Sequence, residues 1–317
     1  MLHIFAGPPS DGQYPLAPLV RDSAGNIYGT TALGGSDGDG TVFKIDTAGN
    51  ETLLHSFTGF SGGDGCGPAQ GLVIDKSGNL FGTTGGCGAS SSGTIFEIDS
   101  SGNETILHSF GGGDGANPQY GHLIMDNAGN LYGVTSMGGA VGLGVVYEFN
   151  IATGTFTLLH SFAGGTDGCY PYGSVVQDKA GNLYGTTLLC GSSLAGTIWK
   201  VSTTGKETIL HNFSHGPSNG CIPYGGVAVD AKGNLYGVTS GCGANNWGAL
   251  YELSTTGKFS LLHSFDYWKD GADPMGEVLL TTSGKLFGTT YQGDTHESNC
   301  FAGLTQSGCG TVWSYKP

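Results

Sequence analysis

Four polar side chains in the sequence have the chemistry that acid–base catalysis or metal binding requires. A histidine beside a carboxylate can transfer protons, and the same two groups can bind a metal ion through nitrogen and oxygen. An isolated polar residue in a channel, by contrast, often only binds water. The four candidate catalytic residues are His122, Glu277, His296 and Glu297.

Aromatic side chains form a second candidate set, and their chemistry suits binding. Exposed rings beside amides and carboxylates, such as Asn245, Asn246 and Asp266, can stack on sugars or hold a cationic partner. The alternative is that several of the tyrosines fill the channel of the fold. The candidate ligand-binding residues are Tyr120, Tyr172, Tyr224, Trp247, Tyr267, Trp268 and Tyr291.

Three motifs recur along the whole chain and indicate which elements position these residues. They are an aromatic-Gly-(Thr/Val)-Thr segment, a Gly-Thr-Val-Phe-like segment and Leu-His-(Ser/Asn/Ile)-Phe. The leading aromatics of the first motif follow one another in steps of 53, 51, 52, 52 and 51 residues. A repeat of this length with several strands is typical of the blades of a β-propeller. These aromatics are Tyr28, Phe81, Tyr132, Tyr184, Tyr236 and Phe287.

Each repeat predicts four strands, so the expected fold class is all-β. In the second repeat the strands are expected at 72–74, 80–84, 94–98 and 104–110, with tight turns at 75–79 and 99–103. In these turns an aspartate can bond the backbone two residues on, and a glycine takes the left-handed position. A calcium loop is the weaker interpretation, because its alternating carboxylates are absent.

The two ends of the chain predict a closed ring. The last repeat stops at Trp313-Ser314-Tyr315 after its third strand, whereas the chain begins with Leu2-His3-Ile4-Phe5, a fourth strand without its blade. Pairing the two would remove both sheet edges. We therefore predict a single six-bladed propeller of four-stranded blades over residues 1–317. The blades are expected at about 12–64, 65–114, 115–167, 168–219, 220–270 and 271–317 plus 2–5.

The cysteines fall in the connections that emerge on one face of such blades. Three pairs have the same separation of 21 residues, and equal spacing in three repeats predicts one repeated disulfide geometry. A metal site is the weaker alternative, because the sequence has no CxxC pair or cysteine–histidine cluster at zinc spacing. Disulfides indicate an oxidising compartment. The expected bridges are Cys66–Cys87, Cys169–Cys190, Cys221–Cys242 and Cys300–Cys309.

One histidine and one aspartate or asparagine recur in every repeat, and we expect both to be structural. The histidine can bond a neighbouring turn, and the aspartate of an Asp-Gly-x-x-Pro segment can close its own turn. The alternative is a ring of carboxylates that holds a cation in the channel. No cofactor or resident metal is predicted. The residues are His3, His55, His108, His160, His211 and His263, with Asp11, Asp64, Asp114, Asp167, Asn219 and Asp270.

His122 and Glu277 differ from this regular pattern. They occupy the same position in the innermost strand of the third and sixth repeats, so a six-bladed ring would place them on opposite sides of its channel. The sixth repeat also has a loop from Tyr291 to Gly310 that is ten residues longer than the repeat predicts and contains His296 and Glu297. Long loops on rigid scaffolds often carry function.

Composition excludes some partners. The net charge of −14 disfavours nucleic acid and anionic membrane surfaces, which require basic faces. There is no hydrophobic run of membrane-spanning length. The chain opens directly into a strand-like segment, so any export signal is expected to have been removed.

The combined motif resembles the Gly-rich tandem repeats called GloVer, which are found in exported bacterial proteins. The resembling segments are Asp178 to Thr187, Gly196 to Val201 and Glu207 to Phe213, and the pattern covers essentially the whole chain. The resemblance implies export and propeller-like repeats, and it brings no catalytic residues. We expect a secreted or cell-surface protein that binds a glycan or a protein through its disulfide-bearing face, and not an enzyme. The alternatives are a polysaccharide lyase or glycosidase, and an architectural subunit of a surface layer or filament.

Overall fold

The computed structural model describes residues 1–293 and 310–317, and the fold in these residues is all-β. Five sheets of four antiparallel strands and one sheet of three make up most of the described chain. The only described helices are the short α1 (Gly59–Gly62) and a 3-10 turn (Gly165–Asp167). Each repeat found in the sequence therefore forms one antiparallel sheet, and the fold is propeller-like.

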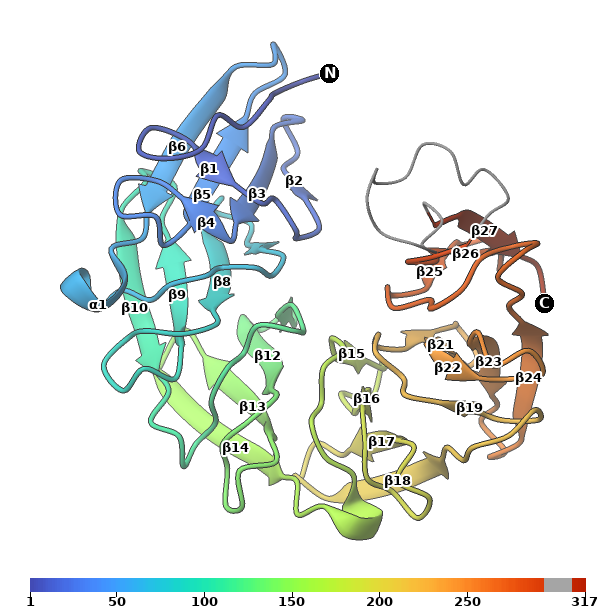
Figure 1. Cartoon of the computed structure of the whole chain (residues 1–317). Coiled ribbons are helices and arrows are strands. Elements are labelled where there is room, and N and C mark those ends of the chain that lie inside the picture. The colour runs from blue at the N-terminus through green and yellow to red at the C-terminus, as the bar shows by residue number, and fades with distance from the viewer. Residues whose placement is uncertain (294–309) are drawn as a thin grey trace. The chain divides into compact units, whose positions relative to one another are not determined.

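The chain divides into two compact units, Met1–Ser161 and Phe162–Pro317. The first unit contains three four-stranded sheets, which follow one another along the chain in Figure 1. Their strands are β2 (Val20–Arg21), β3 (Ile27–Thr31), β5 (Thr41–Ile45) and β6 (Glu51–Ser56); β7 (Val73–Ile74), β8 (Leu80–Thr84), β9 (Thr94–Ile98) and β10 (Glu104–Ser109); and β11 (Ile124–Met125), β12 (Asn130–Thr135), β13 (Val145–Asn150) and β14 (Thr155–Ser161).

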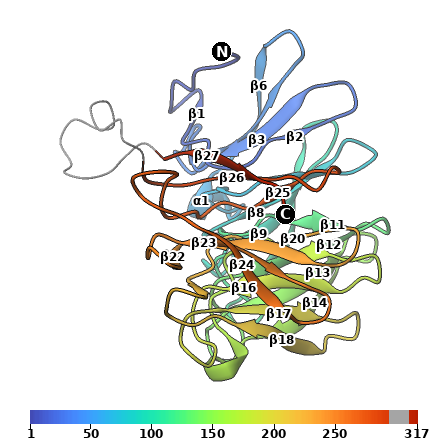
Figure 2. The ribbon, with the colours of Figure 1, turned by 90° about the vertical axis from the view of Figure 1, so that its right-hand side faces the viewer.

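The second unit contains two four-stranded sheets and the three-stranded one. Figure 2 shows β23 beside β24, which pair antiparallel. The strands are β15 (Val176–Gln177), β16 (Leu183–Thr187), β17 (Thr197–Val201) and β18 (Glu207–Asn212); β20 (Ala228–Val229), β21 (Leu235–Thr239), β23 (Ala249–Leu253) and β24 (Phe259–Ser264); and β25 (Leu279–Leu280), β26 (Leu286–Thr289) and β27 (Val312–Tyr315).

Two short ribbons lie outside these sheets. One pairs β1 (Gly12–Gln13) with β4 (Leu33–Gly34), and the other pairs β19 (Gly220–Cys221) with β22 (Gly241–Cys242). Each joins the connection that precedes a sheet to the loop between the second and third strands of that sheet. The strands of the second repeat lie where the sequence predicts them, to within one residue at either end.

A glycine opposite an aromatic ring explains why two of the sequence motifs recur together. Gly185 of β16 pairs directly with Trp199 of β17, and a Cβ on Gly185 would lie 2.4 Å from the Trp199 ring. Trp199 is completely buried. The glycine therefore leaves the space that the ring fills, as tight core packing requires. The same pairing joins Gly29 to Phe43, Gly82 to Phe96, Gly133 to Tyr147, Gly237 to Tyr251 and Gly288 to Trp313.

The aspartates of the tight turns bond within their own turns, which confirms the turn interpretation. The Asp22 carboxylate accepts the backbone N–H of Asn26 at 2.8 Å and the Asn26 side-chain amide at 2.7 Å. It also accepts the Tyr28 hydroxyl at 3.0 Å. These hydrogen bonds lower the pKa of Asp22, and the bond from the Asn26 side-chain amide has the largest effect.

The N-terminal segment is not itself a strand. Residues 1–7 have no strand assignment, and the sheet of β25, β26 and β27 has three strands within the described chain. The closure of a ring by residues 2–5 thus stays a prediction, and so does the single six-bladed domain.

Candidate functional site

Three disulfides join the connections and loops as their equal spacing predicts. They are Cys66–Cys87, Cys169–Cys190 and Cys221–Cys242, with Cα–Cα distances of 5.3, 5.4 and 5.4 Å. In each bridge one cysteine is buried and the other is partly exposed. Cys300 and Cys309 lie outside the described residues, so their pairing stays a prediction.

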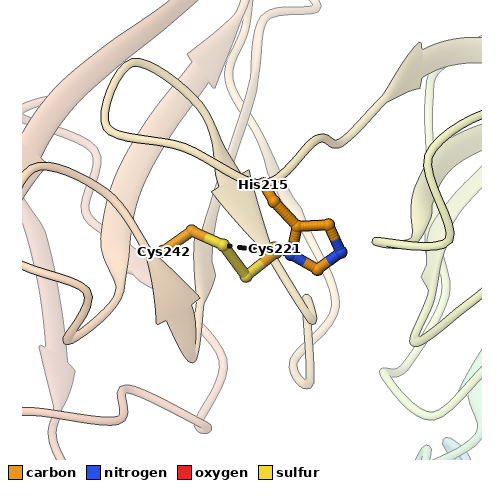
Figure 3. Close-up of side chains that lie close together, drawn as sticks. All are labelled: His215, Cys221 and Cys242. Carbon is orange, nitrogen blue, oxygen red and sulfur yellow. Dashed lines mark hydrogen bonds between the residues drawn. A yellow bond between two sulfur atoms is a disulfide. The ribbon is translucent and has the colours of Figure 1, made fainter.

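The Cys221–Cys242 bridge has a histidine beside it that the sequence analysis did not identify. His215 is exposed in the connection after β18, and its Nδ1 lies 3.7 Å from Sγ of Cys242 (Figure 3). One ring nitrogen and both sulfur atoms lie within 4.8 Å of one another. A histidine six residues before a cysteine was the available signal, but only the fold brings its ring to the sulfur of Cys242.

Three of the predicted ligand-binding aromatics form one cluster in the second unit. Trp247 lies in the loop between β22 and β23, and Tyr267 and Trp268 follow β24. The Tyr267 ring centroid lies 5.1 Å from that of Trp247 and 4.8 Å from that of Trp268. The two tryptophans are 39% and 57% exposed, whereas Tyr267 is only 7% exposed. Tyr267 therefore supports two exposed rings from within the fold.

Polar contacts hold the two segments of this aromatic cluster (Trp247, Tyr267 and Trp268) together. The Asn245 side-chain amide donates to the Phe265 carbonyl at 3.1 Å, which ties the Trp247 loop to the segment after β24. Asp266 accepts the Trp268 backbone N–H at 3.1 Å and pairs with Lys269 at 2.9 Å. The cluster is thus positioned before any ligand binds, which lowers the entropic cost of binding.

The other predicted aromatics are placed separately. Tyr172 and Tyr224 contact each other edge to face at 5.4 Å between centroids, and both are half-buried. Tyr291 is exposed in the second unit, and Tyr120 is exposed in the first.

The two candidate catalytic residues within the described chain lie in different compact units, and each is described within its own unit. Within the first unit, His122 lies beside Gly71 of the neighbouring sheet, since a Cβ on Gly71 would be 3.5 Å from the His122 Cβ. Within the second unit, Glu277 is exposed, and its Oε1 accepts the Ser174 backbone N–H at 3.2 Å. His296 and Glu297 lie outside the described residues. The His122–Glu277 pair stays a prediction.

The histidines of the repeats bond to the aspartates of the following connections. His55 Nε2 lies 3.2 Å from Asp64 Oδ2, and the same contact joins His3 to Asp11, His108 to Asp114 and His263 to Asp270. In the fifth connection Asn219 takes this role for His211 at 3.2 Å. Burial lowers the pKa of His55, so the ring favours its neutral form. The contacts agree with a structural role.

The residue four positions before the repeated histidine divides five of the repeats into two types. In three repeats it is a glutamate, and Glu51, Glu104 and Glu207 each have a buried Oε1 that lacks a hydrogen-bond partner within the described chain. In the third and fifth repeats it is a phenylalanine that stacks on the histidine of the fourth strand of the preceding repeat, as Phe156 does on His108 at 4.1 Å and Phe259 on His211 at 4.0 Å. Burial, with a neighbouring aspartate, raises the pKa of Glu104 and of Glu207 to about 7.

This arrangement predicts that the contribution of Glu104 and Glu207 to stability falls as the pH rises from 4.5 to 7. A carboxyl group whose pKa is higher in the folded than in the unfolded chain binds more protons in the folded state within that range. The variants Glu104→Gln and Glu207→Gln remove this ionisation. Because both groups are half-exposed and partly screened, each variant should gain about 1–2 kcal/mol at pH 8. At pH 4.5 the same variants should gain nothing. Urea unfolding at the two pH values measures both, and equal gains at both would contradict the prediction.

Comparison with known proteins identifies the repeat and the fold. A family described as the Gloeobacter/Verrucomicrobia repeat matches residues 1–193 and 172–317, which together span the chain. A search of curated proteins finds no match. No described helix has the length and hydropathy needed to cross a lipid bilayer.

The solved structures that resemble this chain are distant in sequence. A streptogramin B lyase structure superposes with a TM-score of 0.58 at 16% identity, over 99% of this chain and 85% of that one. A nidogen/laminin complex has a TM-score of 0.48 at 16% identity, over 78% and 80%. TolB from Acinetobacter baumannii has 0.47 at 14% identity, over 86% and 57%. At this identity the first likeness concerns the fold alone.

Proposed function

Since the chain belongs to the Gloeobacter/Verrucomicrobia repeat family, we propose that it is an exported binding protein that holds a glycan through the aromatic cluster of Trp247, Tyr267 and Trp268. The disulfides and the repeats fit an extracellular binding or structural protein. The observation that carries the proposal is the exposure of Trp247 and Trp268 around a buried tyrosine. Large exposed rings in a soluble protein usually mark a binding surface.

A sugar is the ligand class that fits this cluster best. The apolar face of a sugar ring can stack on a tryptophan, while its hydroxyl groups need donors and acceptors at the edge of the site. Asn245, Asp266 and Lys269 provide such groups beside the rings. A flat apolar protein surface would use the rings but not these polar neighbours. Binding of a protein partner is the alternative occupant of the same cluster.

The proposal also includes the closed ring of six blades. In the first repeat Leu19 is 58% exposed, although its equivalents Leu72, Leu123, Val175, Val227 and Val278 are 1–6% exposed. In the last repeat Val312 is 82% exposed, although Val42, Ile95, Val146, Ile198 and Leu250 are at most 1% exposed. The Leu19 position is thus exposed only in the first repeat, and the Val312 position only in the last. Closure would bury both, at about 25 cal/mol per Å² of apolar surface.

The N-terminal segment already makes the side-chain contacts of a fourth strand toward the first repeat. Phe5 packs on Phe43 at 5.0 Å, as Phe57 does on Phe96. His3 bonds Asp11 as His55 bonds Asp64. Residues 1–7 have no strand assignment in the described structure. In a closed ring, they would pair with β27, the third strand of the last repeat.

Glycan binding provides the test of the proposed function. We expect the native protein to bind at least one neutral or acidic glycan on an array, and Trp247→Ala and Trp268→Ala to weaken that binding at least tenfold in calorimetry. Truncation of a central tryptophan commonly costs that much or more. Phe60→Ala is the control, because Phe60 is also an exposed aromatic residue, at 74%, but lies in the first unit, and it should leave affinity unchanged.

Three outcomes would count against the proposal. They are no glycan binding by the native protein, undiminished binding by the two tryptophan variants, and equal loss in the Phe60 control. Binding that persists in Tyr172→Ala, Tyr224→Ala and Trp268→Ala together would also exclude the disulfide-bearing face. The melting temperatures of Trp247→Ala, Trp268→Ala and Phe60→Ala should match the native value, because these three side chains are exposed.

A further inference from the structure

We infer that small thiolates open the Cys221–Cys242 disulfide faster than the other described bridges. We further infer that His215 causes this higher reactivity. The inference is independent of the ligand-binding proposal, because it concerns the chemistry of the bridge itself. It begins from three disulfides of equal span and nearly equal Cα–Cα distance.

The three bridges match in position and accessibility. Each spans 21 residues and joins a connection to the following loop, with Cα–Cα distances between 5.3 and 5.4 Å. Each has one buried cysteine, namely Cys87, Cys169 and Cys221 at 2%, 1% and 4% exposure. The partner cysteine is partly exposed in each case. The bridges Cys169–Cys190 and Cys221–Cys242 are also buried at the same end, in the connection, so burial class does not distinguish these two.

The charged neighbours do distinguish them. A ring nitrogen of His215 lies within 4.8 Å of both Cys221 and Cys242 sulfurs (Figure 3), whereas a carboxylate oxygen of Asp39 lies within 4.8 Å of both Cys66 and Cys87 sulfurs. Within the described chain, Cys169 and Cys190 form no such cluster with a histidine or an acid. The series thus contains a bridge beside a histidine, one beside a carboxylate and one beside neither.

Neighbouring charge controls the rate of thiol–disulfide exchange. The attacking species is a thiolate, and the reaction releases a second thiolate. An imidazolium attracts the first and stabilises the second, whereas a carboxylate repels both. The expected order of opening is therefore Cys221–Cys242, then Cys169–Cys190, then Cys66–Cys87.

The exchange at this site balances in two steps. A thiolate attacks Sγ of Cys242, the more exposed sulfur, forms a new S–S bond and breaks the old one, and the electron pair leaves on Cys221 as a thiolate beside His215. A second thiolate then attacks the outer sulfur of the mixed disulfide and releases Cys242 as a thiolate. Two protons from solvent complete two cysteine thiols. The disulfide gains two electrons, and two reagent thiols are oxidised to one disulfide.

Timed reduction of the folded protein tests the inference. The native chain is treated with dithiothreitol without denaturant, quenched with iodoacetamide at intervals and analysed by peptide mass spectrometry after full reduction and labelling with a heavy alkylating reagent. Cys221–Cys242 should open first. His215→Gln should slow its opening about 3- to 10-fold and leave Cys169–Cys190 unchanged, and His215→Lys should restore the rate. Asp39→Asn should speed the opening of Cys66–Cys87.

The salt dependence of the reduction rate and the order in which the native bridges open complete the test. Because the histidine is exposed, 0.5 M NaCl should reduce the difference between native and His215→Gln proteins. The inference is overturned if Cys221–Cys242 opens no faster than Cys169–Cys190, if His215→Gln has the native rate, or if all three bridges open together at the rate of global unfolding. The ranking of the native bridges decides the question even if a variant fails to fold.

Discussion

Gly185→Ala is expected to destabilise the protein by about 2–3 kcal/mol, which is large for the addition of one methyl group. The new Cβ would lie 2.4 Å from Cζ2 of Trp199, a contact that no real Cβ makes, so the ring or the strand has to move. Trp199 is completely buried, and a close-packed interior offers little space for that movement. Urea unfolding followed by circular dichroism measures the change, with the m-value as a check that the unfolded state is the same.

Two further variants separate ring contact from a general effect of replacing glycine. Gly113→Ala is the matched control, because Gly113 has no atom within 4 Å of its would-be Cβ and no left-handed backbone. It should change stability by less than about 0.5 kcal/mol. In a Trp199→Leu background, Gly185→Ala should cost at least about 1 kcal/mol less than in the native chain. Equal costs for Gly185→Ala and Gly113→Ala would contradict the packing explanation.

A second large effect is expected from a new disulfide between Ile4→Cys and Thr311→Cys. In the complete sheets, Thr41 pairs with Ser56, Thr94 with Ser109 and Thr197 with Asn212. The repeat makes Thr311 and Ile4 the equivalent pair of a closed ring, and directly paired residues in a sheet have Cα distances that a disulfide can span. The bridge should form spontaneously within one molecule and add about 2–4 kcal/mol to the free energy of unfolding.

Gel electrophoresis without reductant separates the possible outcomes. A fast-migrating monomer supports the closed ring, and a ladder of covalent oligomers supports the architectural alternative, in which the end of one chain completes the sheet of the next. Ile4→Cys with Ser283→Cys is the control, because Ser283 lies in the turn at the other end of the last sheet. It should remain uncrosslinked. Absence of any bridge in the Ile4–Thr311 variant would contradict both arrangements.

These two experiments depend on features that were predictable from the sequence to different degrees. The strands, their order and the turns recur with such regular local chemistry that sequence alone located them. An aspartate four residues before an asparagine bonds the same turn wherever it occurs, because the contact is local. Equal spacing likewise predicted the three bridges, since a repeated backbone repeats its Cα distances.

Contacts between residues distant in sequence were decided by the tertiary structure. The sequence contains Gly185 and Trp199 in separate motifs, and only strand pairing places the ring over the glycine. Nothing in the local pattern distinguishes exposed Trp247 and Trp268 from buried Tyr267. The same holds for His215, an irregular residue in a connection, whose approach to Cys242 depends on how two loops meet.

The sequence by itself determined the all-β repeat, its turns and the three described disulfides. These features depend on short-range geometry that recurs from repeat to repeat. The tertiary structure alone decided which aromatic rings face solvent, which glutamate oxygens are buried without a hydrogen-bond partner in the described chain, and which bridge has a histidine beside it. Those properties depend on packing between neighbouring repeats, where small differences in side-chain type, such as Glu104 against Phe156, change the environment without changing the fold.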